Sequence, residues 1–118
     1  MRILVIGGGA AGASAASRAK KANPNSEVYL IEETNIITHA PCGIPYAIGG
    51  LSPINKLYLY SPEKFENERG IRVFTNTKVD EIDTDRQTVT ILRNGHKEKI
   101  AFDKLIIATG AKPIKPKI

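Results

Sequence analysis

Cysteine, histidine and long apolar runs are all scarce in this chain, and each scarcity excludes a class of protein. Cys42 is the only cysteine among 118 residues, so no intrachain disulfide can form and a reducing compartment is expected. No stretch approaches the roughly 18 apolar residues that a membrane-spanning helix needs. The apolar run Ile3–Ile6 is also too short for the core of a signal peptide. We therefore expect a cytoplasmic protein with no membrane partner.

Clusters of charge and of metal-ligating side chains are missing as well. The 17 Lys and Arg residues exceed the 12 Asp and Glu residues, but they are spread along the chain, which argues against a nucleic-acid partner. A mildly positive surface suits an anionic nucleotide cofactor equally well. Neither His39 nor His96 has a second ligand at metal-binding spacing, so no metal site is expected.

The first 32 residues have the pattern of a strand, a helix and a second strand. The run Ile3–Ile6 stops at Gly7, which is typical of a strand buried on both faces of a parallel sheet. The Ala-rich segment from Ala10 to about Ala22 predicts a helix, which Asn23-Pro24-Asn25 ends. Glu27–Glu32 predicts the second strand and completes a βαβ unit.

The rest of the chain is predicted to pass from an irregular region to a helix and then to strands. Residues 36–61 are rich in proline and glycine, with one short helix near 43–48. Within this region, the alternation of Leu57 to Tyr60 predicts strand packing rather than a stacking role for the tyrosines. Ser61-Pro62-Glu63 predicts the start of a helix that ends at Gly70.

Strands follow this helix at residues 71–74, 79–82, 88–92, 98–102 and 104–108, with Asn94-Gly95 as a hairpin turn. The predicted fold class is therefore α/β: a parallel sheet plus a three-stranded antiparallel β-meander. We expect one domain over residues 1–112. The Pro- and Lys-rich residues 113–118 are typical of a linker.

The segment Gly7–Gly12 matches the pattern Gly-x-Gly-x-x-Gly in the setting that this pattern requires. It follows a buried strand, opens a helix, and precedes Glu32 by 20 residues. Gly7 permits the tight turn, Gly9 lets the backbone approach a pyrophosphate, and Gly12 allows close packing of helix on strand. The helix N-terminus would bind phosphates, and Glu32 would bind a ribose. An adenine dinucleotide site is predicted; the alternative is a glycine-rich turn in which Glu32 only solvates a strand end.

The order of elements after Glu32 favours FAD over NAD as the dinucleotide. A domain that binds NAD usually continues with further βα units of regular length. This chain instead continues with the Pro/Gly-rich region, the meander, and a buried strand that ends in Ala108-Thr109-Gly110.

Three segments, Met1–Glu33, His39–Tyr46 and Leu105–Pro113, resemble the FAD-dependent pyridine nucleotide-disulfide oxidoreductase family. Within that family they are most similar to the branch of coenzyme A-disulfide reductase, NADH oxidase and NADH peroxidase, which uses a single active cysteine. Pro41–Tyr46 marks the branch, and Ala108–Pro113 resembles the second family signature. The resemblance covers essentially the whole chain but only the first quarter to third of such an enzyme.

The resemblance implies a Rossmann-like FAD-binding fold and a set of site residues. The residues implied at the FAD site are Gly7, Gly9, Ala10, Ala11 and Gly12 at the pyrophosphate, Glu32 and Glu33 at the adenosine ribose, Lys78 and Val79 at the adenine, and Thr109 and Gly110 in the flavin pocket. Cys42 would be the catalytic residue against the flavin ring, and Arg18 and His39 would contact the substrate or the phosphates of CoA. The implied activity is NAD(P)H-dependent reduction of a disulfide such as CoA-disulfide, of a peroxide, or of oxygen.

Cys42 is the residue on which the implied chemistry depends. A thiolate attacks disulfides and peroxides, and the N–H groups of the short helix predicted next to it would stabilise that thiolate. In the resembled enzymes the sulfur cycles through a mixed disulfide with CoA or through a sulfenic acid. The alternative is an inert buried cysteine, a common fate of lone cysteines.

Several parts of the resembled enzymes have no counterpart in these residues: a second Gly-x-Gly-x-x-Gly, a later FAD-contacting strand that ends in Gly-Asp, and a dimerisation domain. We expect a part of a longer enzyme that is inactive alone, and favour a fragment or split reading frame over a small subunit with a partner chain. Uncovered apolar surface would favour a homo-oligomer or a partner chain that supplies the missing domains. The alternatives in function are a non-catalytic flavin- or nucleotide-binding electron-transfer subunit and an NAD-binding regulatory module.

Overall fold

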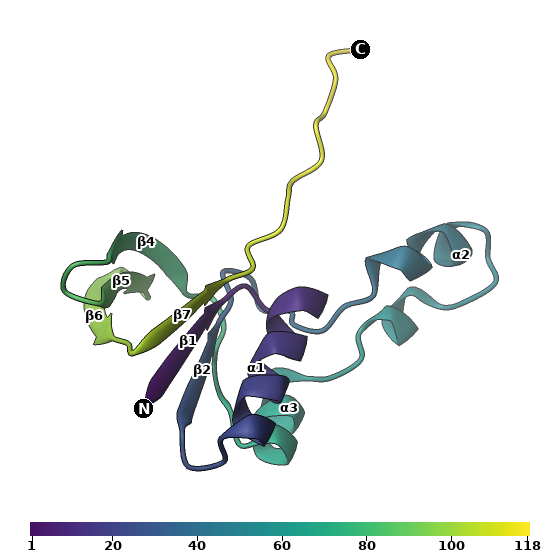
Figure 1. Cartoon of the computed structure of the whole chain (residues 1–118). Helices are drawn as coiled ribbons and strands as arrows, with labels where there is room; N and C mark the ends of the chain where they lie inside the picture. Colours follow the sequence, from purple (N-terminus) through teal and green to yellow (C-terminus); the bar gives the residue numbers. More distant parts are fainter.

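A computed structural model describes all 118 residues and has a parallel sheet between two different layers (Figure 1). The sheet has the strand order β3-β2-β1-β7, formed by Arg72–Phe74, Glu27–Ile31, Arg2–Ile6 and Lys104–Ile107. Helices α1 (Ala10–Ala22) and α3 (Pro62–Arg69) cover one face. The antiparallel meander of β4 (Lys78–Asp83), β5 (Thr88–Arg93) and β6 (His96–Ala101) covers the other. The predicted α/β class is confirmed.

The central strand β1 is buried from both sides, as its unbroken apolar run predicts. Ile3 and Val5 pack toward the helices in one core that includes Ala16, Leu30 and Phe65. The alternate residues of β1 pack toward the meander in a second core; its buried members are Leu4, Ile6, Ile31, Val89, Ile91 and Phe102. The sheet therefore separates two cores, and β1 contributes to both.

Local sequence signals fix the ends of these elements. Asn23 caps the C-terminus of α1, and the Ser61 hydroxyl accepts a hydrogen bond from the Lys64 amide at the start of α3. Asn94 and Gly95 have φ values of 52° and 76°, the left-handed pair that joins β5 to β6 in a type I′ hairpin. These predicted boundaries are confirmed to within a residue or two.

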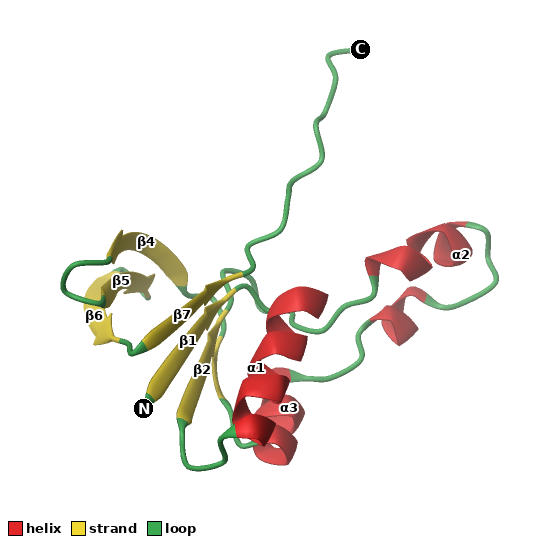
Figure 2. Cartoon of the chain, viewed as in Figure 1, coloured by secondary structure: helices red, strands yellow, loops and turns green.

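Residues 39–59 form an extension, here called the arm, that projects from the end of the sheet (Figure 2). It contains the 3-10 segments Pro41–Gly43 and Ile54–Leu57 and the short helix α2 (Ile44–Ile48), and the rest has no regular structure. The predicted short helix near residues 43–48 is confirmed.

The predicted strand packing of residues 57–60 is wrong, because the returning part of the arm has no second strand to pair with. Only one isolated bridge, between His39 and Tyr58, joins its two sides. Tyr58 and Leu59 are exposed, and only Tyr60 packs against a core, through an edge-to-face contact with Phe65. Apolar alternation by itself did not specify a partner strand.

Residues 108–118 have no helix or strand and extend away from the domain (Figure 1). Ile114 and Ile118 in this segment are fully exposed. Elsewhere in the chain, no helix combines the length and the apolar character that crossing a membrane requires.

Candidate functional site

The glycine-rich turn lies between the end of β1 and the start of α1, where steric contacts select two of its glycines. Gly7 has a φ of +104°, and a Cβ there would lie 2.1 Å from the Ala108 carbonyl oxygen at the end of β7. A Cβ at Gly12 would lie 1.7 Å from the Gly7 carbonyl oxygen. The predicted roles of Gly7 in the turn and of Gly12 in helix–strand packing are therefore met by the geometry.

Gly9 differs from these two because nothing lies within 4 Å of the position of its absent Cβ. It is the N-cap residue of α1 and has no side chain to cap the helix, and the first turn holds no acidic residue. The Ala13 amide bonds to the Gly9 carbonyl at 2.9 Å, so the amides of Ala10 and Ala11 precede the intrahelical ladder. This open, positive helix end fits a phosphate group.

Glu32 follows β2, and its carboxylate accepts three hydrogen bonds, one of them from the turn. The Gly8 amide donates to its Oε1 at 2.9 Å, and the amide and hydroxyl of Thr34 both donate to Oε2 at 2.8 Å. A carboxylate has about four acceptor positions, so one remains for an added donor such as a ribose hydroxyl. The carboxylate of Glu32, the residue predicted to bind a ribose, is thus oriented by Gly8 of the turn and by Thr34.

A cavity of about 230 Å³ lies beside the turn, where the carboxyl ends of β1, β2 and β7 meet the start of β4. It is lined by Ile6, Gly7, Ile31, Glu32, Glu33, Thr77, Lys78, Val79, Ile82, Ile107 and Thr109. Six of these residues come from the set that the resemblance implied at FAD, although they are widely separated in the sequence. The carboxyl edge of a parallel sheet is where α/β proteins bind nucleotides. Gly110 adjoins this cavity in sequence but does not line it.

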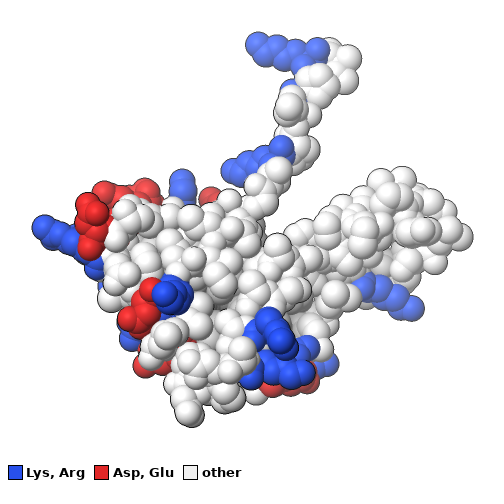
Figure 3. Space-filling model, viewed as in Figure 1, with Lys and Arg blue, Asp and Glu red and all other residues white.

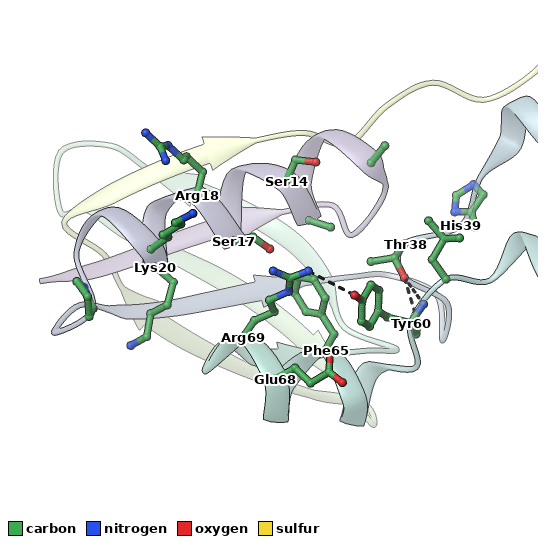
Figure 4. A pocket seen from close by; sticks show the side chains of 15 residues that line it. Ser14, Ser17, Arg18, Lys20, Thr38, His39, Tyr60, Phe65, Glu68 and Arg69 are labelled. Carbon is green, nitrogen blue, oxygen red and sulfur yellow. Dashed lines mark hydrogen bonds between the residues drawn. The ribbon is translucent and has the colours of Figure 1, made fainter.

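A larger hollow of about 990 Å³ lies between α1, α3 and the root of the arm (Figure 4). Arg18 and His39, the two predicted substrate contacts, both line it, together with Ala10 at the start of α1. Its other polar lining residues are Ser14, Ser17, Lys20, Lys21, Thr38, Tyr60, Glu68 and Arg69. The hollow carries four Lys and Arg side chains and one acidic residue, a balance that suits an anionic ligand.

Cys42 lies in the arm and lines neither of these cavities. Its side chain is exposed, so Cys42 is not a buried cysteine in this chain, and its catalytic role stays a prediction. No group of three or more His, Cys, Asp and Glu side chains could hold a metal ion.

Several residues at the site were not predicted. Gly8 is not a consensus position, yet it donates to Glu32, and a Cβ there would lie 2.6 Å from the Ile37 side chain. Ser14, Ser17 and Lys21 accompany Arg18 on one helix face. Their spacing of three or four residues was a signal available in the sequence. Arg69 comes from α3, and only the packing of α3 against α1 identifies it.

The family of pyridine nucleotide-disulphide oxidoreductases matches the chain over residues 1–118. The NAD(P)H coenzyme A polysulfide/persulfide reductase of Pyrococcus horikoshii is 45% identical over 117 residues, which are 99% of this chain and 26% of that protein. The coenzyme A disulfide reductase of Staphylococcus aureus is 36% identical over 113 residues, 93% of this chain and 26% of that protein. The chain thus spans about a quarter of the length of the curated relatives it matches.

Solved structures show the same relationship. A NAD-dependent persulfide reductase from A. fulgidus superimposes with a TM-score of 0.95 at 40% identity, over 100% of this chain and 22% of that one. A water-forming NADH oxidase from Lactobacillus brevis gives a TM-score of 0.91 at 33% identity, over 100% of this chain and 27% of that one. These neighbours confirm the Rossmann-like class of the fold. This chain therefore belongs to the pyridine nucleotide-disulphide oxidoreductase family.

Proposed function

We propose that this chain is the FAD-binding N-terminal part of an NAD(P)H-dependent flavoprotein oxidoreductase that acts through Cys42. The carrying observation is the cavity at the carboxyl edge of the sheet, which gathers Gly7, Glu32, Glu33, Lys78, Val79 and Thr109 next to the open N-terminus of α1. The family uses FAD and NAD(P)H, and this arrangement has the parts that the adenine half of a dinucleotide requires.

The start of α1 and the neighbouring cavity have distinct tasks in this proposal. The amides of Gly9, Ala10, Ala11 and Gly12 at the start of α1 would bind the pyrophosphate. Glu32, with Glu33 beside it, would bind the ribose, and Lys78 and Val79 would flank the adenine. Thr109 and Gly110 would border the flavin end. When bound, FAD would accept electrons from a pyridine nucleotide and deliver them to the sulfur of Cys42.

Cys42 supplies the nucleophile in this proposal. Its thiolate would attack one sulfur of a disulfide, or the inner sulfur of a persulfide, form a mixed disulfide, and release the other sulfur as a thiolate or as hydrosulfide. With a peroxide the thiolate would attack one oxygen and break the O–O bond, so that the sulfur becomes a sulfenic acid and the other oxygen leaves as water or an alcohol. The exposure of Cys42 supports this role because a nucleophile must be accessible to its substrate.

The hollow between α1 and α3 would hold the phosphates of a CoA-linked substrate. Arg18 and Arg69 come from the two helices, and His39 comes from the arm that carries Cys42. Relatives at 36% to 45% identity are named for reactions that involve coenzyme A. Peroxide and oxygen stay as further candidate substrates, since another relative at 34% identity is named NADH oxidase.

The missing parts of the catalytic cycle would come from a further region of the enzyme or from a partner chain. The outer edge of β7 has no neighbouring strand, although its sequence Lys-Leu-Ile-Ile is typical of a central strand. In our proposal residues 1–112 are the incomplete FAD domain, and residues 113–118 link it to the rest. The cytoplasmic location and the homo-oligomeric state stay predictions.

Binding of FAD and of ADP to the purified chain tests the proposal by calorimetry. Both should bind, since ADP carries the adenine half alone. Gly9→Asp should weaken both by about tenfold or more, because a carboxylate would face the phosphates. Glu98→Gln, an exposed change in β6, is the control. Equal affinity of the Gly9→Asp and wild-type chains for both ligands would contradict the cofactor assignment.

The role of Cys42 needs a separate test in the assembled enzyme, with its remaining domains present. Cys42→Ser should abolish NADH-dependent reduction of CoA-disulfide and leave FAD affinity unchanged. Retained reductase activity would favour the second candidate, a flavin-binding electron-transfer subunit that passes electrons to another protein. One observation favours that candidate: a relative of known structure at 27% identity is an NADH:rubredoxin oxidoreductase, with a TM-score of 0.77.

A further inference from the structure

The arm that carries Cys42 has no core of its own. Every residue from 39 to 59 is exposed or half-buried, whereas Ile37 just before the arm is 1% exposed. On the returning side, Tyr60 packs on the buried Phe65 of α3 with ring centroids 6.0 Å apart. The orientation of the arm relative to the sheet therefore depends on the few contacts at its root, between residues 37–38 and 59–60.

Thr38 makes most of these root contacts. Its amide donates to the Gly8 carbonyl at 2.8 Å, and its carbonyl accepts from the Leu59 amide at 3.2 Å. Its hydroxyl accepts from the Tyr60 amide at 2.9 Å and donates to the Tyr60 carbonyl at 3.1 Å (Figure 4). The amide, the carbonyl and the hydroxyl of Thr38 therefore all form hydrogen bonds, and the hydroxyl acts both as donor and as acceptor. Thr38 thus joins the two sides of the arm at its root and connects them to the cofactor turn, while the Ala40 amide bonds to the Leu57 carbonyl further along the arm.

The backbone of Thr38 is strained, which indicates that these contacts determine its conformation. It has a φ of +53°, although β-branched residues rarely adopt the left-handed region. The residue is 7% exposed, so water is not available to replace lost hydrogen bonds. Such a conformation persists only where the surrounding structure over-determines it, and strain of this kind is concentrated at functional sites.

We propose that Thr38 is a positioning residue, whose hydroxyl fixes the arm, and with it Cys42, relative to the Gly7–Gly12 turn. The proposal rests on the proposed function in one respect, namely that Cys42 is the group worth positioning. The path runs from Gly8, which also donates to Glu32, through the Thr38 amide to Tyr60 and back along the arm. Nucleotide binding at the turn and placement of the sulfur would share this connection.

The single cysteine makes a direct test possible. A nitroxide attached to Cys42 reports the motion of the arm in the complete chain by electron paramagnetic resonance. A second label at Leu51, 80% exposed in the arm, is introduced as Leu51→Cys in a Cys42→Ser background. Thr38→Val keeps the shape of the side chain and removes the hydroxyl. It should raise the mobile spectral component about twofold at both labels, since the arm would move as a unit. Thr38→Ser keeps the hydroxyl and should give the wild-type spectrum.

A matched control separates positioning from general destabilisation. Val89→Ala truncates a fully buried residue of the second core, on the far side of the sheet from the arm. It should lower the urea midpoint without changing either spectrum. If Thr38→Val does not fold, Thr38→Ala replaces it against the same Thr38→Ser comparison. An unchanged Leu51 label in the hydroxyl-free variant, or equal mobility in Thr38→Ser, overturns the proposal. Neither readout requires redox activity, so failure of the Cys42 chemistry would be detected separately, by the reductase assay.

Discussion

The βαβ unit and the arm are consecutive in the chain but obey different constraints. Most of β1 and β2 is buried, and the turn between β1 and α1 has no space for a side chain at Gly7, Gly8 or Gly12. The arm is similarly rich in glycine, yet none of its residues is buried, and Ile48 and Leu51 are about four-fifths exposed. The first region is shaped by its own packing, whereas the second is shaped by contacts at its root.

The βαβ unit and the arm also differ in how many charged side chains they carry. The arm carries one charged side chain, Lys56, and its surface in Figure 3 is otherwise free of Lys, Arg, Asp and Glu. An exposed surface that is both apolar and nearly uncharged is typical of one that another surface covers. The comparison thus contrasts a turn that is fixed by close packing with an arm whose apolar surface is uncovered.

Gly12→Ala should have the largest effect, because the new Cβ would overlap the Gly7 carbonyl oxygen at 1.7 Å. We expect a loss of about 4 kcal/mol or more in the free energy of unfolding, since the overlapping group belongs to the backbone and cannot rotate away as a side chain could. Urea denaturation followed by circular dichroism measures this loss. Gly9→Ala is the control and should cost less than about 1 kcal/mol, because its Cβ meets nothing within 4 Å. Equal losses of stability in Gly12→Ala and Gly9→Ala would contradict the predicted steric difference between these two positions.

The second-largest difference should appear when an apolar side chain of similar size is truncated in each region and the free energies of unfolding are compared. Leu30→Ala, at a residue that is 0% exposed in β2, should cost about 3 kcal/mol through lost burial and a cavity. Ile48→Ala, at a residue that is 82% exposed, should change the free energy of unfolding by less than about 0.5 kcal/mol. The same denaturation measurement applies. A comparable cost at Ile48 would show that the arm has a core after all.

The exposed apolar surface of the arm should cause the chain to associate in solution. Light scattering during size-exclusion chromatography should give a mass that rises with concentration. The double change Ile48→Ser and Leu51→Ser should lower it, since it removes the two most exposed apolar side chains of the arm. Ile114→Ser, 93% exposed in the C-terminal segment, is the matched control and should have little effect. A monomer at all concentrations would contradict the prediction.

The smallest effect is expected from the ion pair that joins the starts of β1 and β2. The hydrogen bond from the Arg2 guanidinium, at 3.0 Å, lowers the pKa of Glu27 below its ordinary value of 4.5. A carboxyl group with a lowered pKa stabilises the fold above that ordinary value, and the contribution is lost as the pH falls through the lowered one. Glu27→Gln should therefore be slightly less stable than wild type at neutral pH and equally stable in acid.

The test compares thermal unfolding midpoints of wild type and Glu27→Gln across pH, with Glu98→Gln as the unpaired control. Added salt should shrink the difference, because the pair is partly exposed to solvent. If Glu27→Gln lowered the stability of the chain more than Leu30→Ala does, surface charge rather than burial would be the main factor that stabilises the βαβ unit.

Much of the βαβ unit was predictable because its signals are local and agree with one another. The apolar run of β1, the Ala-rich α1 and the Asn23 stop each act over a few residues, and the structure reproduces them. The alternation of residues 57–60 was an equally local pattern, but a strand requires a partner, which the arm does not offer. Thr38 gave no signal, because its importance depends on Tyr60, distant in the sequence.

The order of elements, the bend at Gly7–Gly12 and the family could be predicted from the sequence, because each depends on residue types and spacings within short segments. The tertiary structure was needed to show that Lys78 and Thr109 border the same cavity as Glu32, that Arg69 and Arg18 line the same hollow, and that Thr38 bonds to Tyr60 at the root of the arm. The physical reason is that these contacts join residues brought together by burial of two cores. Such long-range packing is a property of the whole chain rather than of any short segment.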